Sequence, residues 1–181
     1  MSTPTFTSLP YQRPVLSELA QKHAELTQRL SQANSDAEAV AVVRDWNVLR
    51  IHVSTMGSLA EVHFTQNVAD VAAKEEKLFY DLNGPSIAEL DIAFARSILQ
   101  SPYRGVVAAT FGELFLTRLH NASLTFEPSI KDLLVHESEL CRKYNELTAS
   151  AQIEVGGETY NLSTIGRLLI DLDRSTREAA H

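Results

Sequence analysis

The chain has 181 residues, of which 44% are hydrophobic and 22% charged, so it is long enough for one domain with a sizeable core. Its formal net charge is −7 and its basic residues are scattered, which excludes a nucleic-acid-binding surface built on a basic patch. Seven glycines and six prolines are few for a sheet protein with many turns, and the composition therefore favours helices.

The N-terminal segment is predicted to be an extended arm followed by a helix. Residues 1–14 contain three prolines and several threonines, and Pro14 suits the first turn of a helix. Apolar residues then recur every three or four positions from Leu16 to Leu30, which is the spacing of one helical face. We therefore predict an arm over residues 1–14 and a helix over residues 15–34.

The next two predicted helices begin at recognisable caps. Ser35 and Glu38 have the S-x-x-E spacing of a capping box, so a long helix should start there. Its residues expected to face the core are Val43, Trp46, Leu49, Val53, Met56, Ala60 and His63. A further helix is predicted from an Asn67 cap to Asn83-Gly84-Pro85, where glycine permits a left-handed cap and proline blocks continuation.

Three more helical faces follow along the chain. One covers residues 87–98 and is closed by Ser101-Pro102. The next covers residues 107–119 and ends before the polar residues 120–123. The longest and most regular covers residues 130–151, where apolar positions alternate by threes and fours over several turns.

The hydrophobic period changes from helical to alternating in AQIEVGGETYNLST, residues 151–164. Gly156-Gly157 suits a two-residue turn with positive backbone angles, which predicts a β-hairpin. Ser163 can cap a last pair of helices, over residues 164–172 and from residue 173 onward. The residues expected to alternate across the hairpin are Ile153, Val155, Tyr160 and Leu162.

These elements predict a mostly α fold, a multi-helix bundle with one short β-hairpin near residues 152–162. The chain ends in REAAH, which is rich in helix-forming residues and has no terminating residue. We interpret this ending as a sign that the chain is cut short.

The segment HESEL, residues 136–140, differs by one residue from the zinc motif H-E-x-x-H. That motif places two histidine ligands on one helix face and a glutamate general base between them. Here Leu140 replaces the second histidine, and no two histidines in the chain are four residues apart. The helical pattern places His136 and Glu139 on the polar side and Leu140 toward the core. We therefore interpret the likeness to a zinc site as accidental.

Other candidate metal ligands and nucleophiles are better explained by packing. His23, His52 and His63 lie on or beside apolar faces, where a hydrogen-bonded core histidine is more common than a ligand. Cys141 is predicted on the buried face of its helix, as a small apolar side chain. Trp46, Tyr144 and the phenylalanines fall at helical spacing and are expected in the core.

The paired carboxylates are also expected to be structural. Glu75-Glu76 and the pair Glu137 and Glu139 have lysines nearby at positions 74, 77 and 143, which indicates salt-bridged surfaces. The sequence therefore predicts no catalytic residue and no metal ligand in this chain, and it leaves the substrate-binding residues unknown.

The cellular setting is predicted from what the sequence lacks. One cysteine cannot form a disulfide within the chain, and the first residues have neither the basic start nor the apolar run of an export signal. No apolar stretch approaches the ~18 residues that span a membrane. We expect a cytoplasmic protein with no membrane partner and no nucleic-acid partner.

The order of several motifs resembles the N-terminal region of oligoendopeptidase F-like proteins, which are relatives of thimet oligopeptidase. The resemblance covers nearly the whole chain, beginning with PYQRPVLSELAQKH and continuing through EEKLFYDLNGP. Its most specific part is the order of the E-x-x-L at residues 137–140, Tyr144 with Leu147, the hairpin at residues 157–162, and Asp173-Arg174.

The resemblance implies a zinc-dependent endopeptidase that hydrolyses short peptides within a largely helical channel. In that family, zinc is held by H-E-x-x-H and a later glutamate in a C-terminal catalytic domain, which is absent from this chain. None of those ligands has a counterpart here, so we expect no cofactor in this chain, and zinc in the catalytic domain of the parent protein. The implied role of residues 15–181 is a helical lid or channel-wall domain, whose partners are that catalytic domain and oligopeptide substrates. We also expect an apolar patch, along residues 107–181, that the catalytic domain would cover.

Two alternatives from other classes stay open. A free-standing helical protein could use the same bundle to bind a partner helix or peptide without any enzymatic activity. An unrecognised enzyme built on the scattered histidines and carboxylates would show peptide turnover that survives a chelator.

Overall fold

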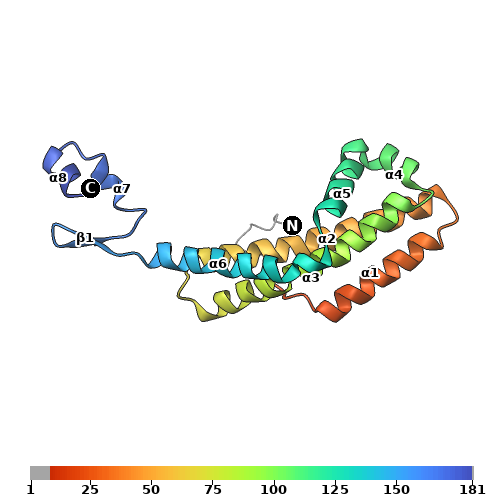
Figure 1. Ribbon diagram of the computed structural model, residues 1–181, viewed down its shortest axis with the longest axis horizontal. Helices are drawn as coiled ribbons and strands as arrows, with labels where there is room; N and C mark the ends of the chain where they lie inside the picture. Colours follow the sequence, from red (N-terminus) through yellow and green to blue (C-terminus); the bar gives the residue numbers. More distant parts are fainter. Residues whose placement is uncertain (1–8, 181) are drawn as a thin grey trace, which may run out of the picture. The chain divides into compact units, whose positions relative to one another are not determined.

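The computed structural model describes residues 9–180, and it confirms a mostly α fold with one short β-hairpin (Figure 1). In chain order its helices are α1 (Leu16–Ser31), α2 (Asp36–Gln66), α3 (Val71–Gln100), α4 (Arg104–Phe111), α5 (Glu113–Thr125), α6 (Lys131–Ser150), α7 (Gly166–Leu169) and α8 (Arg174–Ala179). A 3₁₀ turn, η2 (Pro128–Ile130), precedes α6, and the hairpin consists of β1 (Ile153–Val155) and β2 (Glu158–Tyr160). No helix within residues 9–180 is both long enough and apolar enough to cross a membrane.

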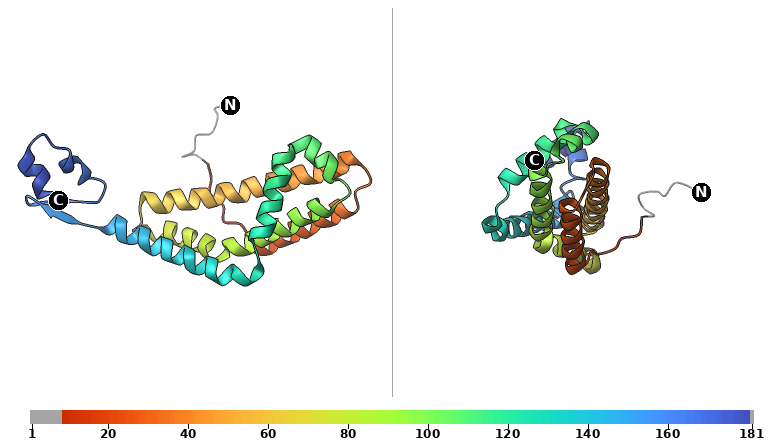
Figure 2. Two further views of the ribbon diagram at one scale, coloured as in Figure 1. Left: turned by 45° about the horizontal axis from the view of Figure 1, so that its top comes forward. Right: turned by 90° about the vertical axis from the view of Figure 1, so that its right-hand side faces the viewer.

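The chain divides between Val135 and His136 into two compact units, and α6 continues through this boundary. The first unit is built on α1, α2 and α3, which lie side by side along their lengths (Figure 2). Helix α4 packs on α2, and α5 packs on α3. Short connections of a few residues reverse the chain between the long helices, as expected for antiparallel neighbours.

The main core of the first unit gathers apolar side chains from α1 to α5. Trp46 and Phe94 are its largest members, 1% exposed each, with ring centroids 5.0 Å apart. Burying an aromatic side chain of this size contributes about 1.5–3 kcal/mol. The other buried members are Leu26, Leu30, Ala39, Val42, Val43, Ala95, Ile98, Val107, Leu116 and Leu119. A smaller cluster of Leu19, Val53 and Ile87 joins α1, α2 and α3 further along.

Helices α1 and α2 follow the sequence-based prediction closely, with one correction. The Ser35 hydroxyl accepts a hydrogen bond from the Glu38 N–H, while the Glu38 carboxylate accepts from the Asn34 N–H instead of completing the box at Ser35. His63 was predicted to face the core, but it is exposed and Phe64 is buried in its place. Over a helix of 31 residues, a small error in the assumed period moves the buried face by one residue.

Helix α3 runs without interruption through Pro85, so the predicted stop at Asn83-Gly84-Pro85 is wrong. A proline within a helix removes one backbone hydrogen bond and crowds the Cβ of the preceding residue. Gly84 has no Cβ, which removes that second difficulty. Pro85 and Ile87 are buried, and this packing offsets the missing hydrogen bond.

The start of α3 was also predicted three residues too early. Its N-cap is Asp70 rather than Asn67, because the Asp70 carboxylate accepts hydrogen bonds from the N–H groups of Ala72 and Ala73 at 2.9 and 3.1 Å. Both residue types are good caps, so the sequence pattern alone does not distinguish them.

The single helix predicted over residues 107–119 is two helices, which meet at Gly112. Its backbone angles are φ 89° and ψ 151°, a combination that is open in practice to glycine alone. Helix α5 then continues to Thr125, through the polar residues 120–123 predicted to end it. Arg96 of α3 donates hydrogen bonds to the carbonyl oxygens of Ser123 and Phe126, which satisfies the end of this helix.

The second unit contains the predicted hairpin. Gly156 and Gly157 have φ of 63° and 83°, and Ile153 pairs with Tyr160 in antiparallel register. The predicted last two helices are present as the short α7 and α8, with Asp173 as the N-cap of α8. Before α7, the amide oxygen of Asn161 accepts from the N–H groups of Ser163 and Thr164, so the predicted Ser163 cap is wrong.

Residues 9–15, which include the end of the predicted arm, form neither helix nor strand. The rest of that prediction, residues 1–8, lies outside the described residues.

Candidate functional site

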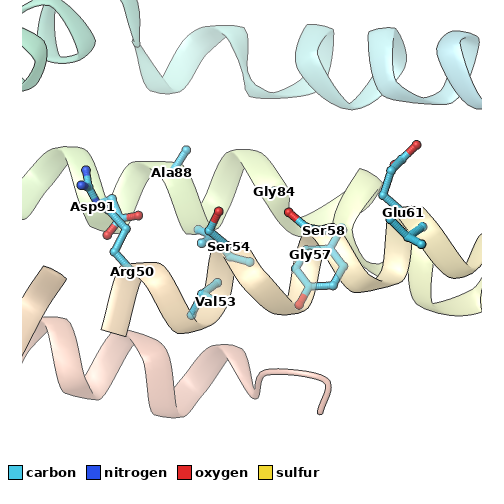
Figure 3. Close-up of a pocket in the computed structure, with 12 residues that line it drawn as sticks. Arg50, Val53, Ser54, Gly57, Ser58, Glu61, Gly84, Ala88 and Asp91 are labelled. Carbon is cyan, nitrogen blue, oxygen red and sulfur yellow. The ribbon is translucent and has the colours of Figure 1, made fainter. Parts of the chain in front are cut away.

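A groove of about 640 Å³ runs between α2 and α3 (Figure 3). Figure 3 shows side chains of both helices around this groove, with Arg50 and Asp91 toward one end and Glu61 toward the other. Its apolar lining comes from Val53, Val62, Ile87 and Ala88. The serines Ser54 and Ser58 add hydroxyl groups one helical turn apart on α2.

Glycines from both helices line this groove. A Cβ atom at Gly57 would lie 3.2 Å from Cε1 of Tyr80, which is tighter than nine in ten real Cβ contacts. The absence of a side chain at Gly57 therefore lets the Tyr80 ring lie against the backbone of α2. Gly84 lines the opposite wall on α3, next to the proline that the helix tolerates.

At one end of the groove, Asp91 joins three helices through one carboxylate oxygen. Its Oδ1 atom accepts a hydrogen bond from the indole N–H of Trp46 on α2 at 2.8 Å. The same oxygen lies 3.0 Å from Nε2 of His23 on α1. His23 is buried, as predicted for a core histidine, whereas His52 is exposed.

At the other end, Lys77 of α3 links Glu61 of α2 with Asp81 of its own helix. The Lys77 ammonium lies 2.8 Å from Glu61 and 2.7 Å from Asp81. Burial lowers the pKa of Lys77, but the two carboxylates outweigh burial, so its pKa is raised. Asp81 is itself buried, so this pairing supplies the partner that a buried carboxylate requires.

Residues 11–13 cross the bundle at Glu76 of α3. The Tyr11 hydroxyl donates to the Glu76 carboxylate at 2.5 Å, and the Arg13 guanidinium donates to both of its oxygens at 2.8 Å. Arg13 also lies over the Phe79 ring at 5.2 Å, and the Tyr11 and His63 rings form a T-shaped pair with centroids 6.5 Å apart. The hydrogen bond from Arg13 lowers the pKa of Glu76, in spite of partial burial.

The HESEL segment lies within α6, where His136 and Glu139 share the polar side as predicted. The His136 Nδ1 atom is 3.8 Å from the Glu139 carboxylate, and both side chains are accessible to solvent. Lys143 pairs with Glu139 at 2.7 Å, and its hydrogen bond lowers the pKa of Glu139. Within residues 9–180 no three histidine, cysteine, aspartate or glutamate side chains converge in a way that could hold a metal ion.

The apolar side of α6 differs from the prediction, because it faces solvent. Leu140 was expected in the core but is 52% exposed, and Tyr144 is 67% exposed. Cys141, predicted to be buried, is exposed as well. No residue of α6 is buried. We refer to three residues on the part of this helix that belongs to the second unit as the α6 stripe: Leu140, Tyr144 and Leu147.

Sequence reasoning missed Asp91 and the glycines of the groove. Asp91 lies four residues after Ile87 and three before Phe94, so it is an acidic residue on an otherwise apolar helical face. Such a residue signals a buried polar network, because a carboxylate on a core face needs partners. Gly57 within a long helix was a second signal of close approach by a neighbouring element.

Comparisons with known proteins point in one direction. A family model described as the Peptidase M3 N-terminal domain matches residues 6–126. A structure of PZ peptidase A with an inhibitor is 26% identical, covering 97% of this chain and 31% of its own, with a TM-score of 0.92. A crystal structure described as oligoendopeptidase F is 27% identical, covering 98% of this chain and 32% of its own, with a TM-score of 0.93.

A protein of Bacillus anthracis described as oligoendopeptidase F is also similar. It is 26% identical, covering 99% of this chain and 33% of its own, with a TM-score of 0.94. The chain therefore spans about a third of the length of these solved structures. No curated protein sequence matches it.

Proposed function

Because this chain belongs to the Peptidase M3 N-terminal domain family, we propose that it is the non-catalytic helical domain of a zinc metalloendopeptidase that cleaves short peptides. The observation that carries the proposal is the similarity of nearly the whole chain to about a third of two peptidases, PZ peptidase A and oligoendopeptidase F. In this proposal the catalytic domain, with its zinc ion and H-E-x-x-H ligands, belongs to the remaining part of the same polypeptide. We place the protein in the cytoplasm, in keeping with its single cysteine.

The proposed role of the domain is to form part of the wall of the substrate channel. A rigid wall admits flexible peptides and excludes folded proteins by size. It also helps to exclude bulk water from the reacting carbonyl group, which strengthens the electrostatic interactions that stabilise the transition state. Helices α2 and α3, of 31 and 30 residues, have the length and shared core for such a wall.

The α6 stripe is the proposed contact with the catalytic domain. Leu140, Tyr144 and Leu147 are four and three residues apart, so they follow one face of the helix, and they are 52%, 67% and 70% exposed. Large apolar side chains in a continuous exposed row indicate a surface that another part of a protein covers.

The first test is the mass of the native gene product, measured by immunoblot of source cells with an antibody raised against this chain. The proposal expects a band about three times the mass of the chain, because the similar structures are about three times as long. A band at the chain's own mass, without evidence of processing, would contradict it.

The second test uses quenched fluorescent peptides. We expect the 181-residue chain to cleave none of them, and the longer gene product to cleave short ones until a zinc chelator is added. Turnover by the chain alone that survives the chelator would favour an unrecognised enzyme instead.

The third test substitutes the α6 stripe in the longer gene product. Leu140→Asp together with Leu147→Asp should lower kcat/KM for peptides by at least about tenfold, because two buried charges would weaken the contact with the catalytic domain. Glu139→Gln, on the polar side of the same helix, is the matched control and should leave kcat/KM unchanged. Equal activity of the two variants would exclude the stripe as the contact.

The groove between α2 and α3 favours a second candidate function, a binding module for a peptide or a partner helix. A native product of 181 residues that binds peptides without cleaving them would support it over the first proposal.

A further inference from the structure

Both ring nitrogens of His23 face hydrogen-bond acceptors. Its Nδ1 atom lies 2.8 Å from the carbonyl oxygen of Leu19, one turn earlier on α1. Its Nε2 atom lies 3.0 Å from Oδ1 of Asp91 on α3. Neither a carbonyl oxygen nor a carboxylate oxygen can donate a hydrogen bond, so each contact requires a proton on the histidine nitrogen.

A neutral imidazole has one N–H group, so it can donate a hydrogen bond at one of these two contacts but not at the other. With its proton on Nδ1, the ring turns a nitrogen lone pair toward the Asp91 carboxylate. With its proton on Nε2, the lone pair faces the Leu19 carbonyl. In either case, two electron-rich atoms lie within about 3 Å in a buried site.

We propose that the folded chain holds His23 as a doubly protonated imidazolium and that it works as a proton-dependent clamp, which fastens α1 to α2 and α3 and loosens when the ring loses a proton. The clamp acts on three helices at once, because the oxygen of Asp91 that faces His23 also accepts the indole hydrogen bond of Trp46.

The surroundings of the ring contain few competing charges. From α3, Asp91 is the charged group in contact with it. From α2, the uncharged Trp46 shares Asp91, and the Arg50 guanidinium lies over the Trp46 ring at 4.8 Å and lines the same groove as Asp91. On α1 itself, the neighbouring Lys22 and Glu25 are exposed. Asp91 is thus the group that decides the protonation of His23.

The electrostatic balance agrees with this geometry. Burial lowers the pKa of His23, but the hydrogen bonds to Asp91 and to the Leu19 carbonyl outweigh it, so the pKa is raised above the ordinary value of 6.5. A raised pKa in the folded state means that folding takes up a proton. The clamp therefore contributes its full stability below pH 6.5, and loses it as the pH rises through the folded-state pKa.

The test follows the ring nitrogens of His23 by ¹H–¹⁵N NMR of the 181-residue chain as the pH is raised. We expect both nitrogens to be protonated at pH 6.5, because the titration midpoint should lie above that value. Hydrogen exchange of the α1 amides, corrected for its intrinsic pH dependence, should become at least severalfold faster above that midpoint. A single protonated nitrogen at pH 6.5, or exchange in α1 that ignores the midpoint, would overturn the proposal.

The matched variant is Asp91→Asn, which keeps the shape and the accepting oxygen but removes the charge. It should lower the midpoint of His23 below that of the unsubstituted chain, and an unchanged midpoint would overturn the role of Asp91. His23→Gln should abolish the pH dependence of α1 exchange, while His52→Gln, at an exposed position of α2, should preserve it. Should Asp91→Asn fail to fold, the NMR titration of the unsubstituted chain still decides the protonation of His23.

Discussion

Gly112 occupies a backbone conformation that side-chain-bearing residues avoid, and it separates α4 from α5. An added Cβ would meet no atom within 4 Å, so Gly112→Ala introduces backbone strain without a packing clash. We expect a loss of about 1–3 kcal/mol in the free energy of unfolding, measured by urea denaturation.

The matched control is Gly105→Ala, which adds a methyl group inside α4 where there is also open space. It should leave stability unchanged or slightly raised, because alanine favours helix more than glycine does. Equal losses in both variants would show that the bend at Gly112 does not depend on its positive φ.

Glu76 gives residues 11–13 an acid-sensitive attachment to α3. Its pKa is lowered from the ordinary value of 4.5, chiefly by the hydrogen bond from Arg13. A lowered pKa in the folded state contributes stability that is present above pH 4.5 and is lost as the pH falls through the folded-state pKa. Glu76→Gln should therefore lower the free energy of unfolding by up to about 1 kcal/mol at pH 7, since Arg13 is partly exposed. In acid, below the folded-state pKa of Glu76, the substitution should leave the free energy of unfolding unchanged.

The control for Glu76 is its neighbour Glu75, which is exposed. Glu75→Gln should leave the unfolding midpoint unchanged within error, both at pH 7 and in acid. A stability difference between the Glu76 variant and the unsubstituted chain that does not shrink in acid would contradict the linkage to Glu76.

Single residues also show where the sequence was informative. The burial of Trp46 and His23 followed from helical spacing, because both lie in the regular middle of an apolar face. The contact of Asp91 with His23 did not follow from helical spacing. A periodicity argument treats a carboxylate as a surface residue and has no means of finding a partner 68 residues away in the chain.

At the scale of the elements, the caps decide where helices begin. Asp70→Ala should destabilise the chain by about 1 kcal/mol, because the N–H groups of Ala72 and Ala73 would lose their shared acceptor. Asp70→Asn should retain most of the stability, since asparagine caps about as well. Thermal unfolding followed by circular dichroism separates these outcomes, and equal stability of the alanine and asparagine variants would rule out the cap.

Pro85 and Gly112 show why helix boundaries were the hardest feature to predict. Proline and glycine both disfavour the interior of a helix. At Pro85 tertiary packing overrides this preference and α3 continues, whereas at Gly112 the helix ends. The hairpin at Gly156-Gly157 was predictable because the turn itself requires the conformation that glycine supplies. The exposure of the apolar face of α6 was not predictable from the sequence. Apolar periodicity indicates which face of a helix packs, but it does not identify the partner that this face packs against.

At the scale of the whole molecule, stability should be concentrated in the first unit. Leu59, on α2, is 1% exposed, whereas Leu147, on the α6 stripe, is 70% exposed. Leu59→Ala should therefore cost about 2–5 kcal/mol through lost burial and the cavity left behind. Leu147→Ala should change stability by less than about 0.5 kcal/mol. Urea unfolding of the two variants checks this, and a large loss for Leu147→Ala would mean that the stripe is covered within this chain.

The overall fold class and the family resemblance were predictable because both depend on the order of many elements, which tolerates errors at individual boundaries. The candidate site was not predictable from the sequence, because the groove and the Asp91 network depend on which helices become neighbours. That pairing depends on local fit, such as that of the Tyr80 ring on α3 against the side-chain-free backbone of Gly57 on α2.

The short connection between α2 and α3 has a consequence for the speed of folding. These two helices, which supply the walls of the groove, are joined by residues 67–70 alone, so they meet with little loss of chain entropy. Bundles dominated by such local contacts fold in microseconds to milliseconds. The α2–α3 pair is therefore expected to form early in folding and to provide the surface on which α1 and α5 assemble.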